Sequence, residues 1–596
     1  MRLEKNQFWT YSQWLFENQA LLNGFLLAIA LSIVGFLVSY LIALARRGPG
    51  EGFFAVAKTI GDFVRVDLPG SSLRRIWAIA RLAFKEALRR KVLAVVGLFI
   101  VGIMFAGWYL DPEADQPARL YLSFVLGGTN LLVLLLGLFL SSFSLPADIK
   151  NKTIYTIVTK PVRPTEIIIG RIVGFGLIGS LILLALGLLS YLFVVRGVRH
   201  EHRVETVSQN GLTGITDKEA EHRHEFTLGA DGIGVTEEQK GHRHQVTRKP
   251  GPNGQDTYEI GPPVGGLIAR VPVYGSLRYT DRDGKEAEGI NVGYESEYQK
   301  YIEGNTLSSA IWAFDGVSPN RFPKGLDLEM TLAAFRTYKG DIESGVQGSI
   351  VLRNPDGSAE TERTQFTVRE FQVDQKRIPV KMKGFKNNQP AEVDLFQDIA
   401  PNGQVEVVIR CLDQGQYLGM NVADVYLRAG EVPFWWNFAK GYISMWLQMM
   451  IVICFGVMFS TFLTGPVAMV ATLSCLVLGF FGSIAGEILS GKREGGGPIE
   501  SLVRIPLQLG VVSELDLGNT MVESAIRAVD RPILWFLSTV TSAMPDFRQL
   551  GTSDFVAYGV NIFGDLLGRH LTIAFGYFLL TSLIGYFFLK TREIAA

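Results

Sequence analysis

The sequence predicts a polytopic α-helical membrane protein with a β-rich domain inserted between its helices. Hydrophobic residues make up 48% of the 596-residue chain and gather in blocks long enough to cross a bilayer, although the formal net charge is zero. The segment 197–433 differs, because its short apolar runs are separated by turn signals such as Asp283-Gly284 and Asn402-Gly403. We expect this segment to be an extracytoplasmic antiparallel β domain, folded as a sandwich.

Seven segments are long and apolar enough to be transmembrane helices. A hydrocarbon core of about 30 Å requires about 20 apolar residues in a helix, and the backbone must satisfy its own hydrogen bonds there. The predicted spans are 21–45, 92–110, 120–143, 167–195, 438–463, 467–488 and 571–589.

The distribution of Lys and Arg predicts the orientation, because these residues accumulate in cytoplasmic loops. The segment 46–91 holds 11 basic and 4 acidic residues, whereas the connection 111–119 holds three acids and one Arg. We therefore expect the chain to begin outside and end inside the cytoplasmic (inner) membrane.

The N-terminal part is predicted to contain one transmembrane helix and two segments that contact the membrane surface. Residues 1–47 form an interfacial segment and one transmembrane helix, and residues 48–91 are cytoplasmic. Within them, 73–91 has apolar residues at helical spacing opposite a basic face, as in helices that lie on a membrane surface. The residues expected at that surface are Arg74, Trp77, Arg81, Lys85 and Arg89. An ordinary solvated helix is the alternative.

The remaining boundaries follow the predicted spans. Residues 92–196 form three spans with a cytoplasmic loop at 144–166, residues 434–490 form two spans, and residues 571–596 form the last span and a cytoplasmic tail. The segment 491–570 is expected to be extracytoplasmic or re-entrant, because its apolar run 532–544 is too short to cross. Lys440, near the end of a span, is expected to extend to the interface.

The loop between the third and fourth spans is the most informative segment. Residues 148–171 read DIKNKTIYTIVTKPVRPTEIIIGR. This sequence resembles the cytoplasmic loop of ABC-2-type transporter permeases, where an acid, a Thr, a basic-Pro-Val turn and a second acid precede the next span. The matching residues are Asp148, Thr153, Lys160, Pro161, Arg163 and Glu166. Segment 73–91 similarly resembles the elbow helix of this family.

The resemblance implies that these loop residues couple the chain to a separate ABC ATPase subunit, where ATP binds. It implies a six-helix core that forms half of a bacterial exporter, completed by a second permease copy or a homologous half within the lipid bilayer. Some family members are linked to multi-copper enzyme maturation. The alternative is a membrane-anchored scaffold or mechanical relay whose external domain binds a cell-envelope protein or cargo.

No nucleotide site or catalytic site is expected in this chain. The sequence GEILSGKR at 486–493 resembles a phosphate-binding loop, but Arg493 replaces the hydroxyl that would hold Mg²⁺. The few charges within the spans argue against an ion-coupled carrier. The basic segments are explained by topology, so no nucleic-acid partner is expected. Cys454 and Cys475 lie in predicted spans, and Cys411 is alone in the external domain, so no disulfide is expected within that domain.

Six of the seven histidines form three H-x-H pairs. The pairs are His200/His202, His222/His224 and His242/His244. Residues i and i+2 of a strand lie on one face about 7 Å apart, and imidazole suits Zn²⁺, Cu²⁺ or Ni²⁺, so a divalent metal is one interpretation. The alternative is a duplicated β-hairpin stalk in which the histidines occupy exposed positions.

Overall fold

The structure of the chain is a computed structural model. It describes residues 9–89, 94–106, 110, 116–151, 162–219, 221–250, 256–292, 299–337, 345–368, 373–490, 495–510, 517 and 520–591. The chain divides into two compact units. One contains Thr10–Leu267 and Phe434–Ala596, and the other, termed the β unit, contains Ile268–Pro433.

Six helices among the described residues are long and apolar enough to cross a membrane. They are α1 (Ala20–Arg47), α5 (Pro117–Lys150), α7 (Pro164–Val198), α8 (Phe434–Ser460), α9 (Gly465–Leu489) and α14 (Gly564–Thr591). These helices confirm a multi-pass membrane protein and correspond to six of the seven predicted spans. For the seventh, 92–110, the described part contains the shorter helix α4 (Ala94–Met104), and residues 92–93 and 107–109 lie outside the described residues.

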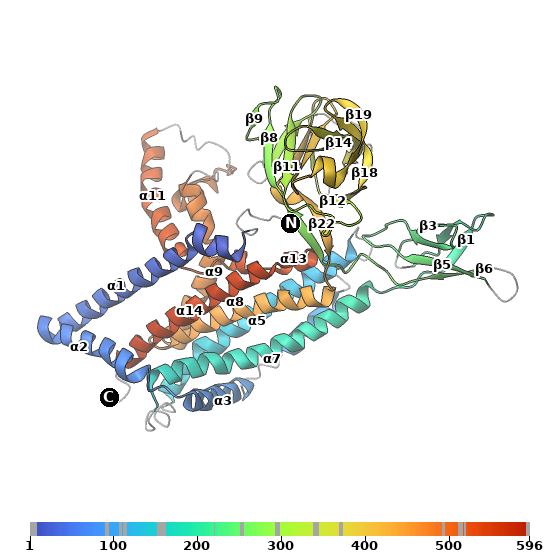
Figure 1. Ribbon diagram of the computed structural model, residues 1–596. Helices are drawn as coiled ribbons and strands as arrows, with labels where there is room; N and C mark the ends of the chain where they lie inside the picture. The colour runs from blue at the N-terminus through green and yellow to red at the C-terminus, as the bar shows by residue number, and fades with distance from the viewer. Residues whose placement is uncertain are drawn as a thin grey trace. The chain divides into compact units, whose positions relative to one another are not determined.

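Helix α8 is the centre of the helical unit and packs against α5, α7 and α14 (Figure 1). Of its most apolar window, 78% is buried, compared with 0% for α1. Close approach of α8 to α5 requires glycine at Gly456, because a Cβ there would lie 2.7 Å from Ser141 Cβ. Lys440 does not extend to an interface as expected. Its ammonium donates to Asn561 Oδ1 and to the Ile562 carbonyl at 2.8 and 2.9 Å, and these bonds keep it inside the protein.

Shorter helices surround this core. They are η2 (Gln13–Glu17), α2 (Pro49–Asp62), η3 (Phe63–Asp67), α3 (Leu73–Arg89), α10 (Pro498–Arg504), α11 (Thr520–Ser542), α12 (Phe547–Leu550) and α13 (Ser553–Ala557). Helix α11 is longer than the apolar run 532–544, because the helix accommodates Pro532. The Asp530 carboxylate accepts bonds from the first backbone N–H groups of α10, at 2.9 Å each.

The inserted segment 197–433 contributes two separate β structures. The first, termed the hairpin module, is an antiparallel meander in sequence order that belongs to the helical unit. Its strands are β1 (Val204–Val207), β2 (Thr213–Thr216), β3 (Glu225–Leu228), β4 (Ile233–Thr236), β5 (Gln245–Pro250) and β6 (Asp256–Ile260). Its small apolar core is formed by Phe226, Leu228 and Val246.

The β unit contains antiparallel sheets with the strand orders β19-β18-β15-β14-β20-β11-β8-β9, β17-β12-β22-β7 and β10-β21-β13, and β16 also pairs with β14. The strands are β7 (Arg270–Tyr274), β8 (Ser276–Thr280), β9 (Glu286–Ala287), β10 (Lys300–Glu303), β11 (Ser309–Phe314), β12 (Leu326–Met330), β13 (Ala333–Arg336), β14 (Val346–Arg353), β15 (Ala359–Thr361), β16 (Thr364–Val368), β17 (Asp374–Ile378), β18 (Lys381–Lys386), β19 (Gln389–Asp394), β20 (Val405–Cys411), β21 (Gln416–Met420) and β22 (Val425–Glu431), with the short helices η5 (Leu395–Ile399) and η6 (Val422–Asp424). Trp312, Leu328 and Leu418 come from the three sheets and share one hydrophobic core. Cys411 is buried and free, so apolar packing stabilises this unit.

Candidate metal centre

Each H-x-H pair lies directly before an odd-numbered strand of the hairpin module. His200 and His202 follow the end of α7 and precede β1, the second pair precedes β3, and the third pair precedes β5. In an antiparallel meander, alternate strands run in the same direction, so β1, β3 and β5 begin at the same end of the sheet. Equivalent histidines are 22 residues apart between the first and second pairs and 20 residues apart between the second and third, which is about the length of one hairpin. The repeat thereby brings all three pairs together.

Local hydrogen bonds hold the pairs in place. The hydroxyl of Thr216, at the end of β2, accepts a bond from the His224 backbone N–H at 2.8 Å. Thr236, at the end of β4, does the same for His244 at 2.9 Å. The middle residue of each pair is exposed, whereas five of the six histidines are buried. The alternative of histidines at exposed positions is therefore wrong for those five.

The imidazole nitrogens converge. The Nε2 atom of His242 lies 3.0 Å from that of His200, 3.1 Å from that of His222 and 3.3 Å from that of His224. The Nε2 atoms of His202 and His222 are 3.3 Å apart. Charged rings at these distances would repel one another, so the cluster disfavours more than one protonated imidazole.

The opposite nitrogen of the second histidine in each pair is held by the backbone. Nδ1 of His202, His224 and His244 lies 3.1, 2.9 and 2.8 Å from the carbonyl oxygens of Asp217, Glu237 and Gly261. The carbonyl accepts, so Nδ1 carries the proton and the Nε2 lone pair of the neutral ring points into the cluster. Metal-ligating histidines use this arrangement, in which a backbone acceptor fixes the tautomer.

Burial also keeps these rings neutral. His224 and His244 have no exposed surface. Burial lowers the pKa of each to about 4, with a further contribution from the neighbouring imidazoles. The same causes lower the pKa of His242 to about 2. The lone pairs are therefore available at neutral pH, without competition from protons.

These features describe a group that could bind a metal ion. The nitrogens of His200, His202, His224, His242 and His244 all lie within 4.8 Å of one another. His222 is outside this group of five, but its Nε2 is in contact with those of His202 and His242. Sequence spacing predicted that each pair shares one face, and the structure places all three pairs at one point.

The structure describes only some of the loop residues that resemble those of permeases. Thr153, Lys160 and Pro161 lie outside the described residues. Glu166 is fully buried in the first turn of α7. Its carboxylate accepts bonds from the backbone N–H groups of Ser72 and Arg163 at 2.7 and 3.0 Å, and from Arg75 Nε at 2.9 Å. Glu166 therefore joins the start of α7 to the start of α3.

Asp148, at the other end of the loop, is also paired within the chain. Arg171 of α7 forms an ion pair with Asp148 of α5, a second with Glu86 of α3 at 3.5 Å, and a hydrogen bond to Ser144. The Arg171 side chain is 2% exposed. This network connects α3, α5 and α7 beside the loop.

A third polar cluster, centred on Asp67, was not predicted. Asp67 accepts bonds from Tyr586 at 2.6 Å and Lys590 at 2.7 Å, and Arg163 lies 3.7 Å away. Burial would raise the pKa of Asp67, but these partners outweigh it and lower the pKa. The acid and its partners on α14 are more than 500 residues apart, so local spacing contains no signal for this contact.

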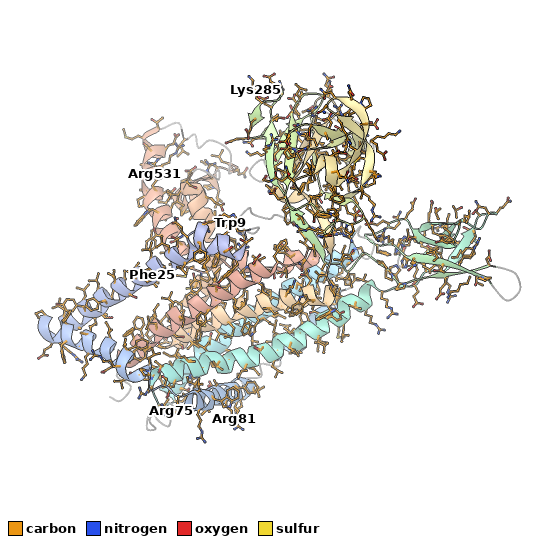
Figure 2. The ribbon with its side chains drawn as sticks, viewed as in Figure 1. Trp9, Phe25, Arg75, Arg81, Lys285 and Arg531 are labelled. Atoms are coloured by element: carbon orange, nitrogen blue, oxygen red, sulfur yellow. The ribbon has the colours of Figure 1, made fainter. Side chains whose placement is uncertain are left out.

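Helix α3 divides its expected apolar stripe between two environments. Ile79, Ala80 and Ala83 are buried against α7, where a Cβ at Gly170 would lie 2.7 Å from Ile79 Cβ. Gly174 approaches Ala80 and Ala83 in the same way. Trp77 is 58% exposed. Arg74, Arg81, Lys85 and Arg89 are exposed, and Figure 2 shows Arg75 and Arg81 along this helix.

Comparison with known proteins identifies no relative, since no family model, no curated protein and no solved structure matches the chain.

Proposed function

We propose that this chain is the membrane subunit of a motor-driven exporter of the ABC-2 type, powered by a separate ATPase. The observation that carries the proposal is the buried Glu166 carboxylate, which ties the loop 144–166 to both α3 and α7. A loop that receives force from a motor must be fixed to the helices that it moves. The resemblance of the loop sequence to that of permeases is consistent with this function.

The polar clusters support a rigid lever. Arg171 connects α7 to α5 and α3, and Asp67 connects the loop end at Arg163 to α14. Ion pairs that are mostly buried and geometrically constrained resist separation, because breaking one leaves a charge without a partner. A push on the loop would therefore move these helices together.

Helix α7 extends this lever. It runs without interruption from Pro164 to Val198, 35 residues, which corresponds to about 50 Å at 1.5 Å per residue. This length exceeds the hydrocarbon core of about 30 Å. Motion at its cytoplasmic end would thus be delivered beyond the opposite membrane surface, where the hairpin module begins.

In the proposed orientation, the parts of the chain lie on defined sides of the membrane. The loop and α3 face the cytoplasm, the hairpin module and the β unit are external, and α3 lies at the membrane surface with Trp77 toward lipid. The β unit folds as a sandwich. A second copy or a homologous half completes the transporter in the inner membrane of a bacterium.

A scaffold or mechanical relay is the second candidate function. It is favoured by the size of the β unit, which has its own core containing Trp312, Leu328 and Leu418. Such a unit would bind a cell-envelope protein, and the helices would anchor it or transmit motion. ATP dependence separates a plain scaffold from a transporter or a relay.

Co-purification tests the proposal. The tagged chain would be extracted from its native host in mild detergent, and ATPase activity would be measured in the purified sample. We expect a stoichiometric ATPase subunit, and we expect Lys160→Glu in the loop to reduce its recovery at least several-fold. Lys285→Glu, at an exposed position of the β unit, is the matched control. Recovery of envelope proteins without an ATPase would overturn the exporter and support the scaffold.

A further inference from the structure

The six imidazoles of the H-x-H pairs have a regular spatial relation. Each ring lies edge-to-face against four of the other five. The ring centroids in these pairs are 4.7–5.2 Å apart, and the ring planes are inclined by 70–89°. The exceptions are the pairs His200 and His224, His202 and His242, and His222 and His244. Six points that each neighbour all but one are the vertices of an octahedron, and the exceptions are its opposite corners.

The sequence repeat is visible in this octahedron. The first histidines of the three pairs, His200, His222 and His242, are mutual neighbours and form one triangular face. The second histidines form the opposite face. Three equivalent hairpins thus supply one histidine each to both faces, which gives the cluster an approximate threefold symmetry.

The dimensions match those of a coordinated ion. In an octahedron the distance from the centre to a vertex is the edge divided by the square root of two. Nε2 separations of 3.0–3.3 Å therefore place the centre about 2.1–2.3 Å from each nitrogen, close to the zinc–imidazole bond of about 2.0–2.1 Å. Four-coordinate geometry would produce similar edges, but it cannot account for six converging rings.

A second observation, a buried nitrogen of His244, points to a ligand. His244 is fully buried, its Nδ1 is bonded to the Gly261 carbonyl, and its Nε2 has no hydrogen-bond partner among the described residues. A buried polar atom without a partner costs about 1–3 kcal/mol. An ion at the centre of the octahedron would satisfy this lone pair.

We propose that the six histidines bind one divalent first-row transition-metal ion in six-coordinate, all-imidazole geometry. The nitrogen set excludes hard ions such as Mg²⁺ and Ca²⁺, which prefer oxygen. Zn²⁺ favours four ligands and Cu²⁺ a tetragonal arrangement. Six equivalent nitrogens therefore suit Ni²⁺, Co²⁺ or Fe²⁺ best, with Ni²⁺ bound most tightly of these three.

The geometry also assigns the role of the ion. Sites that act on substrates keep an open coordination position, whereas structural sites are closed. Six protein ligands leave no open position here. The ion would fasten the three hairpins together and to the end of α7, because His200 and His202 directly follow Val198. This inference stands independently of the proposed transport function.

Metal analysis of the full-length chain tests the proposal. The protein, with a tag that contains no histidine, would be stripped with EDTA and titrated with Ni²⁺ and with Co²⁺. We expect one ion per chain by elemental analysis, and X-ray absorption should show six nitrogen neighbours at about the 2.1–2.3 Å given by the Nε2 separations. The Co²⁺ complex should show the weak visible bands of a six-coordinate ion.

Two variants isolate the site. His244→Ala should weaken Ni²⁺ binding by more than the about 10–100-fold that loss of an outer-sphere partner causes. Arg223→Ala is the matched control, because Arg223 lies between two ligands but is exposed, and it should bind like the unchanged chain. If His244→Ala does not fold, the absorption spectrum of the unchanged chain decides. Four nitrogen neighbours, no stoichiometric binding, or equal weakening by both variants would overturn the proposal.

Discussion

Removal of the Glu166 carboxylate should release α3 from α7. In Glu166→Ala, the backbone N–H groups of Ser72 and Arg163 lose their acceptor. Each buried donor without a partner costs about 1–3 kcal/mol. Arg75 contributes less, because its side chain is 37% exposed and can turn to water. The two donors together give an expected loss of about 2–6 kcal/mol of local stability.

Hydrogen exchange on the full chain in detergent measures this loss directly. A local method is appropriate, because a chain with two units need not unfold in one transition. The expected loss corresponds to exchange at least about 30-fold faster in α3. Exchange in the β unit should not change.

Glu51→Ala is the control for this experiment. Glu51 also lies in the first turn of a helix, α2, but it is exposed. Its removal should cost no more than the about 0.3–1 kcal/mol of a helix-dipole interaction. If Glu166→Ala leaves α3 exchange unchanged, or if Glu51→Ala accelerates α3 equally, the assignment of Glu166 as the anchor of α3 is wrong.

Three other predictions follow from packing, charge and metal binding. Gly174→Leu should separate α3 from α7 and lower thermal stability by about 1–3 kcal/mol, whereas Gly576→Leu, where a Cβ meets nothing within 4 Å, should have little effect in a melting assay. Burial would raise the pKa of Glu406, but bonds from Arg278 and Arg353 outweigh it and lower the pKa. Its contribution to stability is therefore present above the unfolded pKa of about 4.5 and is lost as pH falls through the lower folded pKa. Denaturant unfolding should show that the β unit of Glu406→Gln loses less stability on acidification than that of the unchanged chain. EDTA should accelerate hydrogen exchange in β1–β6, and added Ni²⁺ should restore protection; unchanged exchange would show that these strands need no ion.

The helical spans and the hairpin repeat could be predicted because they depend on local patterns. An apolar run of about 20 residues is sufficient to indicate a membrane helix, and six predicted spans correspond to helices. The period of 20 residues between histidine pairs likewise indicated a duplicated hairpin. The exact ends of the helices and the extent of α11 were less predictable. A proline usually ends a helix, but α11 continues through Pro532.

The partners of the buried charges could not be predicted in the same way. Glu166 is 91 residues from Arg75, and Lys440 is 121 residues from Asn561. Sequence spacing constrains only residues a few positions apart, whereas these pairs depend on which helices pack together. The basic and acidic residues of the loop had several possible partners until the structure placed α3 beside α7.

The sequence by itself predicted helices long and apolar enough to cross a membrane, a strand-rich segment 197–433, and two imidazoles on one side in each histidine pair. Hydrophobic length and strand periodicity are sufficient for these conclusions. The tertiary structure alone decided that the three histidine pairs meet as an octahedron. It alone also decided that Glu166 pairs with Arg75 and that Asp148 pairs with Arg171. The physical reason is that convergence of side chains requires the curvature and packing of complete hairpins and helices, which no local pattern specifies.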